Sequence, residues 1–218
     1  MSGLVIHTEP ASEPITLAEA KSYLRVDSSG DDALITSLIV SARKLCEEHM
    51  QRAIMSQTLQ LFIDTREEIY DSLWEGMRTG PYLNYYKNYI DLPMPTVTAV
   101  THVKTYDDSD NATVFASSKY YVDNARQPAR VVLRTGETFP TALRVANAIE
   151  VQYVTGYANA NSVPEPIKFS IYQVLTYLYE HRGDMYEGKT SLPATASRLL
   201  SPYVVYSGLG SSKLMSLG

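Results

Sequence analysis

Histidine is the first side chain of this sequence to consider for metal binding or proton transfer. The four histidines, His7, His49, His102 and His181, form no HExxH motif, and none stands beside a CxxC pair. His49 falls on an apolar helical stripe and His102 in an alternating strand pattern, which favours structural roles for both. The sequence therefore predicts no metal site built on histidine.

Two short acidic clusters could gather a cation. They are Asp27 with Asp31 and Asp32, and Asp107 with Asp108 and Asp110. Neither is followed by the bidentate glutamate that closes an EF-hand loop at its twelfth position. Helix capping accounts for the first cluster, and a turn between two strands accounts for the second.

Nucleophilic and nucleotide-binding motifs are also missing from the sequence. There is no GxSxG elbow, and Gly208-Leu-Gly210 lacks both the third glycine and the strand–helix context of a dinucleotide loop. Cys46 lies on the apolar side of a long helical pattern, where a cysteine acts as a small buried hydrophobe. We therefore predict no catalytic residue, no metal and no cofactor; the residues alone leave enzymatic activity open but offer no nucleophile or base for it.

The composition is that of a soluble globular protein. The 218 residues are 44% apolar and 20% charged, and the formal charge is −5, with Lys and Arg scattered along the chain. No basic stripe that could grip phosphates is present. The N-terminus lacks a signal-peptide pattern, and no apolar run approaches the ~18 residues that span a bilayer. We expect synthesis in a host cytoplasm and no contact with a membrane.

The elements begin with a break between two helices. After an extended arm over residues 1–13, Thr16 and Glu19 form a capping-box pattern that predicts a short helix. An acidic break near 26–32 follows, and Asp31 or Asp32 is expected to cap the next helix. Apolar residues at three- and four-residue steps then predict a long amphipathic helix over about 31–52.

The periodicity changes to two after residue 55. Short alternating segments predict strands near residues 58–64, 97–103, 114–115, 120–122, 131–133 and 149–154. Their spacing suggests a small antiparallel sheet, a sandwich or a barrel-like unit over about 55–157. Pro164 and Pro166 then open a helix to about 182, and a short helix follows at about 194–201. The C-terminal segment, residues 207–218, is rich in Gly and Ser.

One aromatic segment fits neither period. Residues 68–89 form an aromatic loop containing Trp74, Tyr82, Tyr85, Tyr86 and Tyr89. A loop of this length is unusual in a compact domain and is commonly functional. We favour a projecting loop covered by a partner over a flap that closes the domain's own core. The chain has 17 tyrosines against four phenylalanines. Tyrosine suits surfaces that are exposed in one state and covered by a partner in another.

Several segments, in order, resemble the head–tail connector (adaptor) family of long-tailed bacteriophages and gene transfer agents. The opening is PITLAEAKSYLRVD at residues 14–27, followed by DDALITSLI at 31–39. The later segments are IDLPMPTVTAV at 90–100, VQYVTGY at 151–157, VPEPI at 163–167, YEHR at 179–182 and LLSPY at 199–203. The similarity runs over most of residues 14–206; the aromatic loop and the chain beyond Tyr206 depart from it.

The resemblance implies an α+β fold, in which a helical bundle around a long helix carries an inserted small antiparallel β-domain and an extended C-terminal tail. We expect a single connector-like domain over residues 1–206 and a flexible tail over 207–218. The resemblance also implies a structural virion protein of the neck, with no catalysis. It would form a ring of twelve copies under the portal vertex, above a stopper or tail-completion protein. Genomic DNA would pass through without sequence-specific contacts.

Two surfaces are expected to make these contacts. The tail would order on the portal protein through Tyr203, Leu209, Leu214, Met215 and Leu217. The aromatic loop would touch a neighbouring subunit, the portal or the next protein toward the tail. We also expect the long helix and helix 166–182 to form the wall of the ring. Two alternatives remain at this stage: another neck component such as a stopper, and a carbohydrate-binding or hydrolytic β-module.

Overall fold

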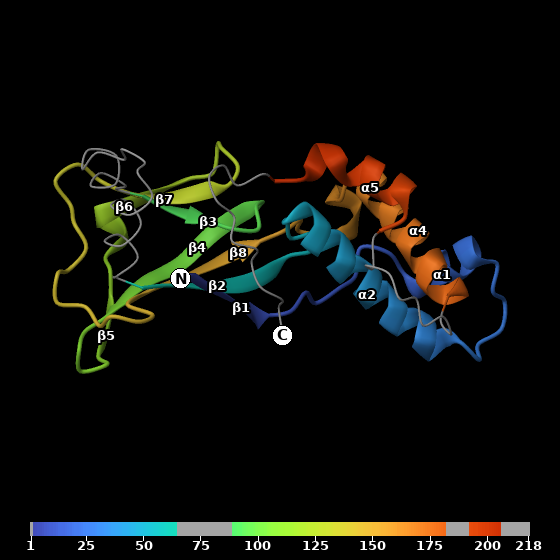
Figure 1. Cartoon of the computed structure of the whole chain (residues 1–218), viewed down its shortest axis with the longest axis horizontal. Coiled ribbons are helices and arrows are strands. Elements are labelled where there is room, and N and C mark those ends of the chain that lie inside the picture. Colours follow the sequence, from blue (N-terminus) through green and yellow to red (C-terminus); the bar gives the residue numbers. More distant parts are fainter. Residues whose placement is uncertain (1, 65–88, 182–191, 206–218) are drawn as a thin grey trace, which may run out of the picture. The chain divides into compact units, whose positions relative to one another are not determined.

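The computed structural model describes residues 2–64, 89–181 and 192–205. Within them the chain has four α-helices and two antiparallel sheets, which confirms the predicted α+β class (Figure 1). The chain folds as two compact units. Within the described residues, we call 10–56, 156–181 and 192–205 the helical unit, and 2–9, 57–64 and 89–155 the β unit.

The helical unit is built from two helix pairs that are far apart in the sequence. Its helices are α1 (Leu17–Leu24), α2 (Asp32–Met50), α4 (Glu165–Glu180) and α5 (Ala194–Leu200), with short 3₁₀ turns at Ala160–Ser162 and Ser201–Tyr203. The predicted capping box is present, since the Thr16 hydroxyl accepts from the Glu19 N–H at 3.2 Å and the Glu19 carboxylate accepts from the Thr16 N–H at 2.7 Å. The 19 residues of α2 give a helix about 28 Å long.

The start of α2 differs in detail from the expectation. Asp31 occupies the N-cap position but makes no side-chain capping bond. Its carboxylate instead accepts a hydrogen bond from the Tyr179 hydroxyl at 2.6 Å, and Asp32 pairs with Lys21 Nζ at 2.6 Å. Both acidic residues therefore tie α2 to a neighbouring helix, which a local sequence pattern does not reveal.

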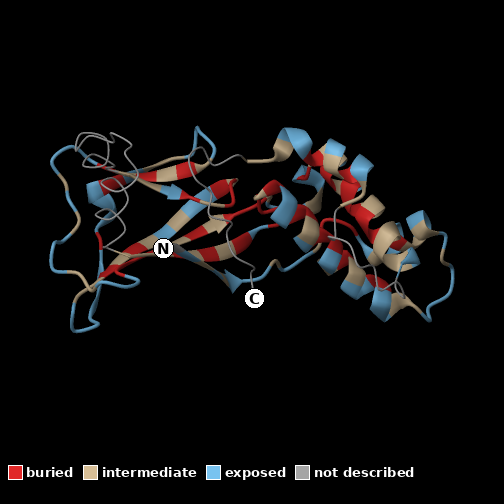
Figure 2. Ribbon diagram, viewed as in Figure 1, coloured by how far each residue is buried: buried red, intermediate tan, exposed pale blue. Residues whose placement is uncertain are grey.

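One apolar core fills the helical unit (Figure 2). It takes the stripe of α2, including Ile35, Ile39 and Cys46, and the stripe of α4, including Ile167 and Ile171. Cys46 is buried as predicted, and its burial raises the pKa of the thiol to about 12. The thiol is therefore protonated and unreactive at neutral pH.

The β unit contains a five-stranded and a three-stranded sheet. The five-stranded sheet has the order β1 (Ser2–Thr8), β2 (Gln57–Ile63), β8 (Ile149–Thr155), β4 (Val97–Tyr106) and β5 (Ala112–Val114). The three-stranded sheet has the order β3 (Tyr89–Leu92), β7 (Ala129–Leu133) and β6 (Tyr120–Asp123), and a 3₁₀ turn at Ser117–Lys119 precedes β6. All six predicted strands are present, and β1 and β3 are additional.

The N-terminal arm belongs to the larger sheet. Residues Ser2–Thr8 form an edge strand that pairs antiparallel with β2, in a register that sets Leu4 opposite Leu61 and Ile6 opposite Leu59. Leu59 and Leu61 are buried, so the arm contributes Leu4 and Ile6 to the covered face of the sheet. Leu4, Val5 and Ile6 are consecutive apolar residues, so this segment lacks the alternation of apolar and polar residues that predicted the other strands.

A close backbone approach joins the segments that enter and leave the β unit. The Ser56 N–H donates to the Tyr157 carbonyl at 3.0 Å, and the Tyr157 N–H donates to the Ile54 carbonyl at 2.8 Å. Gly156 lies between them at φ +102°, and a Cβ there would stand 2.2 Å from the Met55 carbonyl oxygen. Only glycine fits this position.

Candidate assembly surfaces

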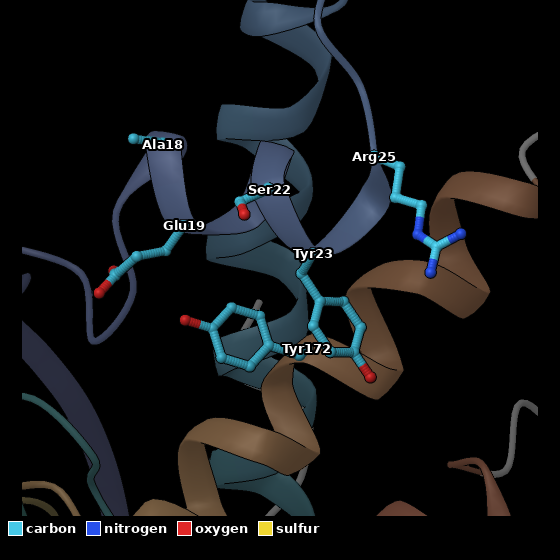
Figure 3. A pocket seen from close by; sticks show the side chains of 6 residues that line it. All are labelled: Ala18, Glu19, Ser22, Tyr23, Arg25 and Tyr172. Atoms are coloured by element: carbon cyan, nitrogen blue, oxygen red, sulfur yellow. The ribbon is translucent and has the colours of Figure 1, made fainter.

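An exposed aromatic cluster stands on the helical unit where α1 meets α4. Tyr23 and Phe169 are 41% and 46% exposed, although both are large and apolar. The ring of Tyr23 stacks on Tyr172 with centroids 4.9 Å apart and meets Phe169 edge-on at 6.1 Å. We call Tyr23, Phe169 and Tyr172 the aromatic patch; Figure 3 shows Tyr23 and Tyr172 side by side.

The groove beside this patch is open to solvent. Ala18, Glu19, Ser22, Tyr23, Arg25 and Tyr172 line it. Ligand pockets enclose most of a small molecule, and this groove encloses little (Figure 3). Aromatic side chains with a charged rim are typical of protein–protein contacts. The groove therefore suits a protein surface better than a small ligand.

The rim of the patch carries fixed charges. Hydrogen bonds from the Thr16 backbone N–H and hydroxyl hold the pKa of Glu19 below its usual value, so the carboxylate is ionised at neutral pH. Partial burial, with the nearby charges of Glu19 and Glu165, raises the pKa of the Tyr172 hydroxyl and keeps it neutral. Glu165 also pairs with Lys168 Nζ at 3.0 Å.

A buried ion cluster fixes the C-terminal half of α2. Arg43 is 2% exposed, and its Nη1 donates to Glu47 at 2.8 Å while its Nε donates to Glu13 at 2.7 Å. Glu47 also accepts the backbone N–H of Ile54 at 2.7 Å. Burial raises the pKa of Glu47, and the Arg43 charge opposes that rise. The cluster ties α2 to the segments on both sides of it.

A second polar cluster lies on the five-stranded sheet. Glu150 of β8 is buried and accepts hydrogen bonds from the Tyr106 hydroxyl, from Gln60 at 3.1 Å and from the His102 ring at 2.9 Å. Burial acts to raise the pKa of Glu150, but the bonds from Tyr106 and His102 outweigh it and lower the pKa. The cluster joins strands β2, β4 and β8. His102 thus has a structural contact, in keeping with its expected role.

Tyr203 and Tyr89 are the two predicted interface residues that the structure describes. Tyr203 packs partly buried against the helical core, and its carbonyl accepts from Arg52 Nε at 3.1 Å. Tyr89 begins β3, with its ring 5.2 Å from the Arg130 guanidinium. The remaining predicted residues lie outside the described part of the chain: Trp74, Tyr82, Tyr85, Tyr86, Leu209, Leu214, Met215 and Leu217.

The aromatic patch was not predicted from the sequence. Tyr23 shares a helical face with Leu17 and Ala20, which is the pattern of a core position. Phe169, however, falls off the buried stripe of Ile167 and Ile171. A large apolar residue on the polar side of an amphipathic helix is a usable signal for a covered surface.

The described residues form neither a metal cluster nor a membrane-spanning helix. Across residues 2–64, 89–181 and 192–205, no three His, Cys, Asp or Glu side chains come together in a way that could hold a metal ion. None of the helices described is both long and apolar enough to cross a bilayer.

Comparison with known structures reveals neck proteins of the same fold. A chain from the neck of an empty gene transfer agent (GTA) particle, computed with C6 symmetry, is 18% identical with a TM-score of 0.70, over 95% of this chain and 97% of that one. A chain from the virion of a native GTA particle is 17% identical with a TM-score of 0.69, over 95% and 97%. A chain from the neck of a native GTA particle, computed with C12 symmetry, is 18% identical with a TM-score of 0.63, over 94% and 98%.

Sequence comparison finds one family match. No curated protein matches the chain. Residues 14–107, less than half of the chain, match the family of phage gp6-like head-tail connector proteins, in agreement with the resemblance found in the sequence. The chain is thus similar to these connectors over that segment and shares its fold with chains of GTA particles.

Proposed function

We propose that twelve copies of this connector form a ring under the portal vertex, which extends the DNA channel and links the head to a stopper or tail-completion protein. The family match over residues 14–107 carries the proposal. The fold shared with neck proteins solved in C6 and C12 assemblies supports the ring and its twelve copies. In this proposal the helical bundle forms the wall, the β unit is its insertion, and genomic DNA passes without sequence-specific contacts.

In a ring, every subunit contacts two neighbours. Each contact therefore joins one face of a subunit to a different face of the next subunit. The aromatic patch supplies one such face, since Tyr23 and Phe169 expose apolar area that a single subunit leaves in water. α1 and α4, which carry the patch, share a core with α2. This agrees with the expectation that the long helices form the wall.

The direct test is to measure the mass of purified subunit with and without purified portal protein, by mass photometry over a concentration series. We expect particles of twelve subunits, at least when portal is present. The protein remaining a monomer in the presence of portal would contradict the ring.

Replacing the patch residues should weaken the ring without unfolding the subunit. For Tyr23→Ser with Phe169→Ser we expect the midpoint concentration for assembly to rise about tenfold or more, because two exposed aromatic anchors are lost. Val5→Ser is the control, since this valine is 48% exposed on the edge strand β1 of the β unit. Equal effects of the patch variant and the control on assembly would remove the patch from the interface.

The tail is proposed to bind the portal, with Leu209, Leu214, Met215 and Leu217 as apolar anchors among Gly and Ser residues. Segments that fold on binding pay an entropy cost, which attachment at many equivalent sites offsets. Deleting residues 207–218 should reduce the affinity of rings for portal at least tenfold in a pull-down titration. The subunit's unfolding midpoint should stay the same. Unchanged portal affinity would exclude the tail.

The aromatic loop is proposed to contact a neighbouring subunit, the portal or the tail-side protein. Tyr89 lies where this loop enters β3, on a face of the β unit that also carries Tyr121 and Arg134. Contacts of the loop with the stopper would give the ring its lower surface.

A further inference from the structure

The outer face of the three-stranded sheet has an ordered row of side chains. On β7, Val131 and Leu133 are buried, so Val132 faces outward. The strand register sets Val132 opposite Tyr89 on one side and Tyr121 on the other. The row Tyr89, Val132 and Tyr121 therefore crosses all three strands on the face opposite the buried residues.

Two arginines flank this row. The Arg130 guanidinium lies 5.2 Å from the Tyr89 ring centroid, and that of Arg134 lies 5.9 Å from the Tyr121 ring centroid. Tyr121 is 47% exposed. Tyrosine and arginine are the residues that most often anchor protein interfaces. We call Tyr89, Tyr121, Arg130, Val132 and Arg134 the arginine–tyrosine face.

The positive charge on this face is unbalanced at one end. Arg130 Nε pairs with Asp123 at 2.9 Å, and Lys119 Nζ pairs with Glu137 at 3.1 Å. Among the residues that the structure describes, no acidic side chain forms an ion pair with Arg134. The end of the face that carries Arg134 and Tyr121 is therefore suited to an acidic partner.

The turn between β4 and β5 has the opposite charge. Asp107 accepts from the backbone N–H groups of Ser109 and Asn111, each at 2.9 Å, and these bonds with that of the Asn111 side chain lower its pKa. Asp110 pairs with Arg144 at 3.0 Å, while Asp108 is exposed and makes no ion pair in the described part of the chain. We call Asp107, Asp108 and Asp110 the acidic tip; it bears three carboxylates against one guanidinium.

We infer that the acidic tip of one copy docks on the arginine–tyrosine face of the next copy around the ring, with Asp108 facing Arg134. The inference rests on the proposed ring. A ring contact joins two different surfaces of the same chain, and these two have opposite charge and lie on opposite sides of the β unit (Figure 1). Complementary charges also set the register of an interface and disfavour wrong pairings.

Charge reversal tests this pairing. Arg134→Glu and Asp108→Lys should each raise the midpoint concentration for assembly about tenfold at low salt, because each replaces attraction by repulsion in every subunit contact. The double variant, Arg134→Glu with Asp108→Lys, should return most of the way to the wild-type midpoint. Arg126→Glu is the matched control, since Arg126 is an exposed charged residue of the β unit outside the proposed contact. We expect it to leave the midpoint unchanged.

A cysteine cross-link supplies a second readout. Cys46 is the one cysteine of the sequence and is buried, so an introduced thiol reacts alone. Under mild oxidation, Asp108→Cys mixed with Arg134→Cys should give disulfide-linked dimers in assembled rings, and Asp108→Cys alone should give few. Failure of both the cross-link and the rescue in rings that still form would overturn this contact and leave the proposed function intact. Failure of wild-type protein to form rings with portal would overturn both.

Discussion

Gly156→Ala should destabilise the helical unit by about 3 kcal/mol, because the added Cβ meets backbone rather than a movable side chain. The Cβ would stand 2.2 Å from the Met55 carbonyl oxygen and 2.9 Å from the Ser56 nitrogen. The residue also keeps φ at +102°, where side-chain-bearing residues are strained. Relief of the clash would break the paired hydrogen bonds between Ile54, Ser56 and Tyr157.

Substitutions at two other glycines distinguish the steric clash from the backbone strain as causes of the lost stability. Gly136 has φ +86° with no atom near its missing Cβ, so Gly136→Ala tests backbone strain alone and should cost about 1 kcal/mol. Gly30 has open space and no such φ, so Gly30→Ala should change stability by less than about 0.5 kcal/mol. Urea unfolding followed by circular dichroism measures all three. Equal losses for Gly136→Ala and Gly156→Ala would show that the close approach to Met55 is unimportant.

Arg43→Met is expected to cost about 3–5 kcal/mol, because it leaves the Glu47 carboxylate buried without its guanidinium. Arg43 is 2% exposed and donates to both Glu13 and Glu47. Glu47→Gln removes the buried negative charge, and its amide oxygen can still accept the hydrogen bond from the Ile54 N–H. Arg43→Met combined with Glu47→Gln should therefore be more stable at neutral pH than Arg43→Met alone.

The pH dependence of Arg43→Met follows from the pKa of Glu47. Burial raises this pKa in the folded state, so the folded protein holds the proton more tightly than the unfolded chain. The stabilisation from that proton is complete below the unfolded pKa and is lost as pH rises through the folded pKa. Removing Arg43 raises the folded pKa further, so the variant should lose more stability than wild type between pH 5 and pH 8. Urea unfolding at both pH values measures this; a parallel pH response of the two proteins would mean that Glu47 is not the group responsible.

Local patterns predicted those elements whose signals are local. The capping box at Thr16 and Glu19, the stripe of α2 and the alternating strands required only neighbouring residues. The division of the strands into two sheets depends on which distant strands pair, such as β2 with β8 across about ninety residues. Nothing in the short segment of β1 or β3 encodes that choice.

The candidate surfaces show the same limit. The aromatic loop was identified by its composition, and Tyr89 at its end lies on the arginine–tyrosine face. The aromatic patch was not predicted, since it forms only when α1 lies beside α4, and these helices are more than 140 residues apart in sequence. Similarly, Asp31 was expected to cap α2, but the fold brings Tyr179 to its carboxylate.

The interleaving of the two units affects how the protein is made. β1 finds its partner only after residues 57–63 have left the ribosome, and β2 waits for β8 at residues 149–155. The core around α2 needs α4 and α5, whose last residue is Leu200. The larger sheet therefore cannot close before Thr155 has been synthesised, nor the helical core before Leu200, and both must wait for slow closure of long-range contacts.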